Sequence, residues 1–142
     1  MSETNKAVVR RLYEAFNTGN LSVYDELVGT NFVYREPMLG ERRGVAGAKE
    51  IVNTYRTAFP DAKITINEQF ADGDVVVTRW TATGTHNGKL LNIGPTGKRV
   101  TCTGILISRL QNGKVVEEFE NFDTLGMLRQ IGAVPTAIGK AA

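Results

Sequence analysis

Residues 75–86 of the chain are VVVTRWTATGTH, and this stretch decides the fold class. Its β-branched and aromatic side chains alternate with the others at a period of two, which is typical of a β-strand. The Asn87-Gly88 pair that follows is a strong signal for a tight turn. We therefore expect a long strand here, then a shorter strand through Leu90-Leu91 and a loop at residues 94–97.

Similar patterns lie on both sides of this strand. Toward the C-terminus, residues 100–110 and 115–122 alternate in the same way and are joined by an Asn112-Gly113 turn. Toward the N-terminus, residues 64–70 alternate and end at a turn in residues 72–74. The second half of the chain therefore predicts several antiparallel strands joined by tight turns.

The first half of the chain predicts helices instead. Apolar residues recur at helical spacing in residues 5–17 and 45–59, with a short helix between them in residues 20–27. A short strand at residues 31–36 and a last helix from Asp123 to Gly132 complete the pattern. Helices early and strands late indicate an α+β fold, in which a curved sheet wraps around the helices and leaves a pocket.

Length and composition predict one domain without a nucleic-acid partner. The 142 residues suit a single domain at 1–135, followed by a loose tail at 136–142. The net charge is +2, and no basic stripe carries interleaved aromatic residues, so we expect no nucleic acid as a partner. The N-terminus has no signal-peptide pattern, and no apolar run is long enough to span a membrane. With a single cysteine, these features predict a cytoplasmic protein.

The sequence offers no recognisable metal or cofactor site. One histidine and one cysteine are too few for a zinc centre, and no phosphate-binding glycine loop is present. A Ser-His-Asp triad would have to use His86, which we expect beside the Asn87-Gly88 turn and facing solvent. We therefore expect no cofactor and no nucleophilic catalysis.

Acid–base chemistry by a carboxylate remains, and Glu120 is the residue that we select for it. It lies near the end of the last strand, between Phe119 and Phe122. Desolvation in an apolar pocket raises the pKa of a carboxyl group toward neutrality, so that it can give or take a proton at cellular pH. The alternative is a surface residue of the acidic run 117–120 that pairs with lysine or arginine.

Other side chains are candidates for binding a substrate beside Glu120. Arg79 would orient a substrate oxygen or pair with a carboxylate such as Glu120. Asp123 stands where the last helix begins, and its alternative role is an N-cap. Trp80 fits a subunit interface as well as a core. The remaining candidates for the pocket or its surroundings are apolar or aromatic: Phe32, Tyr34, Tyr55, Leu106, Phe119 and Phe122.

Four segments resemble the SnoaL-like ester cyclases, and they occur in the order expected for that family. They are VVRRLYEAFNTGN at 8–20, VTRWTATGTHNG at 77–88, PTGK at 95–98 followed by Gly104-Ile105, and NGKVVEE at 112–118. The resemblance implies membership of the nuclear-transport-factor-2-like superfamily. Members of that superfamily are α+β cones, commonly homodimers through the outer face of the sheet.

The resemblance also implies a reaction. SnoaL-type cyclases close a polyketide ring by intramolecular aldol condensation without a metal or cofactor, using a carboxylate on the last strand and a histidine on the strand before it. Glu120 matches the carboxylate position, where the family usually has aspartate, and Leu106 matches the histidine position. Relatives of limonene-epoxide hydrolase use a set of two aspartates and one arginine. Arg79 and Glu120 match two of these three positions, and Thr81 stands at the position of the other aspartate.

Three functional hypotheses follow. The leading one is a cofactor-independent acid/base enzyme that acts on a small apolar carbonyl compound, with Glu120 transferring the proton and Arg79 orienting the substrate. The second is a non-catalytic protein that binds a small molecule in the same pocket. The third is epoxide hydrolysis or hydration by a water molecule that Glu120 activates.

Overall fold

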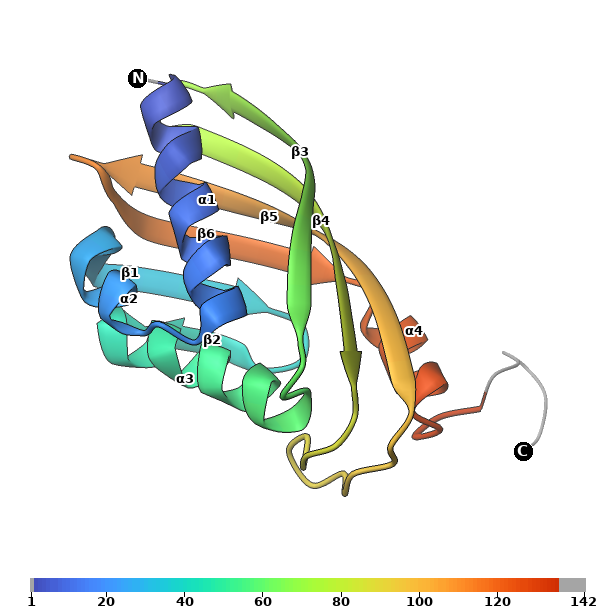
Figure 1. The fold of residues 1–142 in the computed structure, drawn as a ribbon. Helices are drawn as coiled ribbons and strands as arrows, with labels where there is room; N and C mark the ends of the chain where they lie inside the picture. Colours follow the sequence, from blue (N-terminus) through green and yellow to red (C-terminus); the bar gives the residue numbers. More distant parts are fainter. Residues whose placement is uncertain (1, 136–142) are drawn as a thin grey trace.

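The computed structural model describes residues 2–135 and shows helices covering one face of a curved sheet (Figure 1). The elements follow the chain in this order: α1 (Ser2–Thr18), α2 (Ser22–Leu27), β1 (Val28–Glu36), β2 (Gly40–Arg43), α3 (Gly44–Ala58), β3 (Lys63–Asp72), β4 (Val75–Thr85), β5 (Arg99–Gln111), β6 (Lys114–Phe122) and α4 (Thr124–Gln130). None of the helices within residues 2–135 is long and apolar enough to cross a membrane.

The strands form one six-stranded sheet in the order β2-β1-β6-β5-β4-β3. All neighbouring pairs are antiparallel except β1 and β6, which are parallel. The long strands β3, β4 and β5 bend around α1, and α3 lies below it against the other end of the sheet (Figure 1). The predicted α+β cone with a curved mixed sheet is therefore confirmed.

Strand alternation separates the two faces of this sheet. Along β5, every second residue from Val100 to Leu110 is buried, and the residues between them are exposed. The buried face contacts the apolar stripe of α1, which contains Val9, Leu12 and Ala15. The concave face of the sheet and the helices therefore share one core, and apolar side chains on the convex face remain exposed among residues 2–135.

Three elements differ from the sequence-based expectation. Strand β2 was not predicted because its residues GERR have no apolar alternation; it is an edge strand that pairs only with β1. The expected strand through Leu90-Leu91 is wrong, since Leu90 makes only an isolated bridge to Ile93. Strand β1 also begins earlier than predicted, at Val28. The predicted tail at residues 136–142 lies outside the described residues.

The expectation that His86 faces solvent is also wrong, because the loop after it folds back over the ring. His86 is fully buried, and its Nδ1 lies 3.0 Å from the Thr96 hydroxyl oxygen. Its ring centroid is 5.4 Å from that of Phe59, and its backbone N–H donates to the Lys98 carbonyl. His86 therefore holds the loop against the core.

Candidate active site

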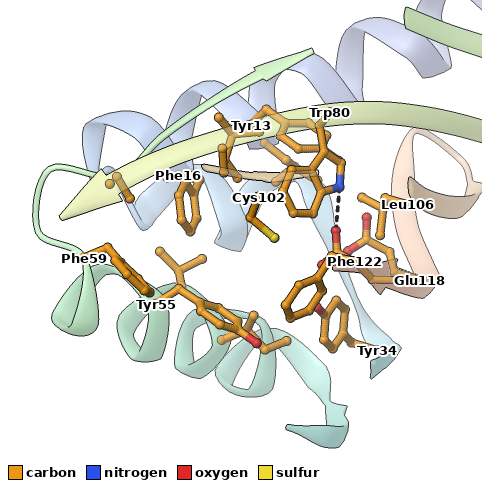
Figure 2. A pocket seen from close by; sticks show the side chains of 18 of the residues that line it. Tyr13, Phe16, Tyr34, Tyr55, Phe59, Trp80, Cys102, Leu106, Glu118 and Phe122 are labelled. Carbon is orange, nitrogen blue, oxygen red and sulfur yellow. Dashed lines mark hydrogen bonds between the residues drawn. The ribbon is translucent and has the colours of Figure 1, made fainter. Parts of the chain in front are cut away.

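A cavity of about 160 Å³ lies between the concave face of the sheet and the helices. Almost all of its lining is apolar or aromatic, and Figure 2 shows the side chains that converge on it. Six of the residues predicted for the pocket line it, together with Glu120: Phe32, Tyr34, Tyr55, Trp80, Leu106 and Phe122.

Glu120 is held inside this cavity by two hydrogen bonds from aromatic side chains. The Tyr34 hydroxyl donates to its Oε1 at 2.6 Å. The Trp80 indole N–H donates to its Oε2 at 2.9 Å, which is the dashed line from Trp80 in Figure 2. Burial raises the pKa of Glu120 to about 7, while the hydrogen bond from Tyr34 opposes the rise. The carboxyl group can therefore both accept and release a proton near neutral pH.

Glu118 is a second carboxyl group that lines the cavity, and the sequence pattern does not single it out as a site residue. It precedes Glu120 by two residues, so the two side chains lie on the same face of β6. The Ser108 hydroxyl donates to its Oε2 at 2.8 Å. Burial raises the pKa of Glu118 to about 8, and the neighbouring Glu120 adds to the rise. The alternation along this strand places Glu118 on the same face as Glu120, but the flanking aromatic residues single out Glu120 and leave Glu118 in the acidic run 117–120.

Besides Tyr34 on β1, tyrosines from three helices line the cavity. Tyr55 on α3 donates to Glu36, a buried carboxylate at the end of β1. Tyr24 on α2 donates to the Leu12 carbonyl oxygen at 3.2 Å. Tyr13 on α1 also lines the cavity; its helical spacing in the sequence favours a core residue first and a pocket residue second. Among residues 2–135, Tyr34 is therefore the tyrosine that donates to a carboxyl group of the cavity.

Arg79 does not reach this site, which corrects the expectation that it orients a substrate or pairs with Glu120. Its side chain lies on the convex face of β4, where its Nε is 2.9 Å from Glu68 Oε1. Residues 79 and 80 point to opposite faces of the strand, so Arg79 and Trp80 cannot share the cavity. Thr81 also faces outward and donates to the Asn67 side chain. The Asp-Arg-Asp arrangement of epoxide hydrolases therefore does not form around Glu120.

Phe119 and Asp123 also lie outside the cavity. Phe119 is 42% exposed on the convex face, and the Arg35 guanidinium lies 5.3 Å from the centre of its ring. Asp123 is the N-cap of α4, where its Oδ1 accepts the Gly126 N–H at 2.9 Å. Neither side chain can contact a ligand inside the cone in this conformation.

Leu106, at the position where the SnoaL-type cyclases have histidine, is the direct partner of Glu120 across the β5–β6 pair. In residues 2–135, the side chains that line the cavity include no lysine, arginine or histidine. No group of three or more His, Cys, Asp or Glu residues with the geometry of a metal site occurs in that part of the chain. Glu118 and Glu120 are therefore the cavity groups with a pKa near neutrality.

The helix-covered sheet and its acid-bearing cavity place the protein among the nuclear-transport-factor-2-like α+β cones. Comparison with known proteins agrees with this class. The family profile described as SnoaL-like polyketide cyclase matches residues 6–131. The chain belongs to this family.

Individual relatives span nearly the whole chain. The aklanonic acid methyl ester cyclase DnrD of Streptomyces peucetius is 28% identical over 128 residues, which cover 88% of each protein. The structure of IdmH from Streptomyces antibioticus is 31% identical with a TM-score of 0.80, covering 90% of this chain and 98% of IdmH. A SnoaL-like protein of Jannaschia sp. CCS1 has a TM-score of 0.87 at 23% identity, covering 95% and 96% of the two chains, and supports the fold alone.

Proposed function

We propose that the protein is a cyclase-type acid/base enzyme that closes a ring in a small, apolar, carbonyl-bearing molecule without a cofactor. The observation that carries this proposal is the environment of Glu120, whose carboxyl group is buried and fixed by Tyr34 and Trp80. The family and the relative named as a cyclase support the type of reaction.

An intramolecular aldol reaction uses the two carboxyl groups in complementary roles. Glu120 as carboxylate takes a proton from the carbon next to one carbonyl group, and the resulting enolate carbon attacks a second carbonyl group of the same molecule. A carbon–carbon bond forms, and the oxygen of the attacked carbonyl takes a proton from Glu118. The pKa of Glu118, about 8, keeps this group protonated while Glu120, with a pKa of about 7, is partly ionised. Proton exchange with solvent restores both groups.

The test of this mechanism is Glu120→Gln, which conserves side-chain volume and removes the titrating group. Loss of a positioned general base typically lowers kcat by about a hundredfold or more, so we expect a fall of that size. The methyl ester of aklanonic acid is the first substrate to try, because the Streptomyces relative is named for it. Arg79→Gln is the matched control, since Arg79 lies on the convex face. Turnover that survives Glu120→Gln on a substrate that the wild type converts would exclude the mechanism.

A non-catalytic binding protein is the second candidate, and the apolar Leu106 beside Glu120 favours it. Without a basic partner for Glu120, the cavity would hold a ligand and leave it unchanged. This function predicts that a bound ligand is recovered chemically intact after long incubation and that Glu120→Gln has little effect on its affinity. Mass spectrometry of the recovered ligand separates the two candidates.

We also propose that two copies of the chain associate through the convex face of the sheet. Four large apolar side chains are between 41% and 59% exposed on this face: Phe70, Ile105, Ile107 and Phe119. Arginine and glutamate side chains of both signs flank them, including the Arg109–Glu117 pair, so the surface can complement a second copy of itself. Light scattering should report a dimer for the wild type and a monomer for Ile107→Glu; a wild-type monomer would contradict the proposal.

A further inference from the structure

Glu118 has a carboxyl oxygen that a molecule in the cavity can contact. Its Oε2 accepts the Ser108 hydroxyl at 2.8 Å, but its Oε1 has no hydrogen-bond partner among residues 2–135. This oxygen keeps accessible surface, unlike the Tyr13 hydroxyl oxygen, which also has no partner but is sealed off. Glu118 lines the cavity, and its side chain stands among the other lining residues in Figure 2. A ligand can therefore supply the donor that Glu118 Oε1 lacks.

The walls of the cavity favour a positive charge on that donor. Glu118 and Glu120 both line the cavity from the same face of β6. Within the described part of the chain no basic side chain lines it, and nine of the lining residues are aromatic. Aromatic rings attract cations through their negative faces, and a carboxylate in an apolar site needs a charge partner. The cavity therefore combines acidic groups with aromatic walls, as expected of a site for an organic cation.

The size of the cavity and the number of acceptors narrow the class of cation. Its volume of about 160 Å³ is close to the roughly 150 Å³ of an engineered apolar cavity that binds benzene, so the ligand body is about one ring in size. A metal ion of the calcium or magnesium type prefers about six or more oxygen ligands, which two carboxyl groups do not supply. An ammonium group carries three N–H donors, which suit Glu118 Oε1 and the remaining lone pairs of Glu120.

We propose that the cavity binds a protonated amine with a one-ring apolar body, whose ammonium group donates to Glu118 Oε1 and pairs with Glu120. The ring of the amine packs against the aromatic walls. This binding site goes beyond the proposed function, because it requires no carbonyl group in the ligand and no turnover.

Binding of an amine in this site depends on pH. Burial raises the pKa of Glu118 to about 8 and that of Glu120 to about 7, so both are mainly protonated at about pH 6. A carboxyl group must release its proton before it can pair with an ammonium group. An alkylamine, with a pKa near the roughly 10.4 of lysine, stays cationic well above pH 8. The affinity for the amine should therefore rise with pH through the titration of the two glutamates.

The tyrosines and the cysteine around the two glutamates stay neutral over this range. Burial raises the pKa of Cys102 to about 11. Burial also raises the pKa of each tyrosine that lines the cavity, namely Tyr13, Tyr24, Tyr34 and Tyr55. Glu36, at the end of β1, raises the pKa of Glu120 but does not line the cavity, and it accepts the Tyr55 hydroxyl. Glu118 and Glu120 are therefore the groups whose ionisation controls binding.

Titrations with cyclohexylamine and cyclohexanol test the proposal. The two molecules share one ring, but only cyclohexylamine carries a positive charge. Trp80 is the only tryptophan of the chain and lines the cavity, so its fluorescence reports binding of both. We expect the affinity for cyclohexylamine to rise about tenfold or more from about pH 6 to about pH 8.5, and the affinity for cyclohexanol to stay nearly constant. At the higher pH, Glu118→Gln should weaken cyclohexylamine binding about tenfold or more and spare cyclohexanol.

Glu117→Gln is the matched control, because it removes the same charge from the convex face, where Glu117 pairs with Arg109. It should change neither affinity. A wild type that does not bind cyclohexylamine, an affinity that does not rise with pH, or a Glu118→Gln variant that loses neither or both ligands would overturn the proposal. The first two outcomes need only the wild type, so they decide the matter even if Glu118→Gln does not fold. Since no turnover is measured, failure here leaves the cyclase proposal to its own test with Glu120→Gln.

Discussion

Replacing Glu118 by glutamine should change how the stability of the protein depends on pH. Burial raises the pKa of Glu118 from 4.5 to about 8. Between these two values the folded chain keeps a proton that the unfolded chain has lost. The stability associated with this proton is complete below the unfolded pKa and is lost as the pH rises through the folded pKa. Wild-type protein should therefore become less stable from acidic to mildly alkaline pH.

The size of this change follows from the pKa shift. One proton of difference between the two states lowers the free energy of unfolding by about 1.4 kcal/mol for each pH unit. Over the roughly three units between about pH 5 and about pH 8, Glu118 accounts for at most about 4 kcal/mol. Glutamine does not titrate, and its amide oxygen can still accept the hydrogen bond from Ser108. Glu118→Gln should match the wild type at pH 5 within about 1 kcal/mol and exceed its stability at pH 8.

Urea denaturation of both proteins across this pH range measures the effect. Glu120 titrates in both proteins, so the difference between the two curves reports Glu118 together with its coupling to Glu120. Glu117→Gln is the matched control for charge, since Glu117 is adjacent in sequence but lies on the convex face with Arg109. Parallel stability curves for wild type and Glu118→Gln would refute the reasoning, because they would mean that Glu118 is ionised in the folded chain.

Three further predictions test other parts of the structure. Tyr34→Phe removes a hydrogen bond that lowers the pKa of Glu120, so that pKa should rise. The acidic limb of the plot of kcat/KM against pH should therefore shift to a pH about one unit higher; a limb at the same pH would contradict the role of Tyr34. Gly104→Ala would place a methyl group against the Trp80 ring and 2.7 Å from Phe122 Cβ, so we expect a loss of about 2 kcal/mol or more of stability in thermal denaturation. Asp123→Ala removes the cap of α4 and should cost about 1 kcal/mol of stability while activity is retained; lost activity would show that Asp123 acts on the substrate.

The sequence predicted the fold well because local patterns specify it. The alternation of side chains along β4 and β5 and the apolar stripe of α1 can be recognised in the local sequence, without knowledge of contacts between distant segments. Strand β2 and the burial of His86 could not be predicted in this way, since both depend on segments that fold back onto the rest of the chain.

The candidate site was predicted only in part, for a similar reason. The alternation placed Glu120 and Trp80 on faces that the structure shows to be concave. It also placed Arg79 and Phe119 on the opposite faces, so a strict use of the same pattern would have excluded them from the pocket. The unpaired hydroxyl of Tyr13 has no signal in the sequence, because it depends on which acceptors the fold brings near.

The position of β6 between β1 and β5 has a consequence for synthesis on the ribosome. Strand β1 emerges early, yet its parallel partner β6, which carries both buried glutamates, is made more than seventy residues later. Until β6 is inserted, a nascent chain has two open strand edges and an unsealed interior, and such edges readily pair with other chains. The strand that carries the acids is thus also the one that closes the sheet, so a chain cannot complete this sheet without also assembling its pair of acids.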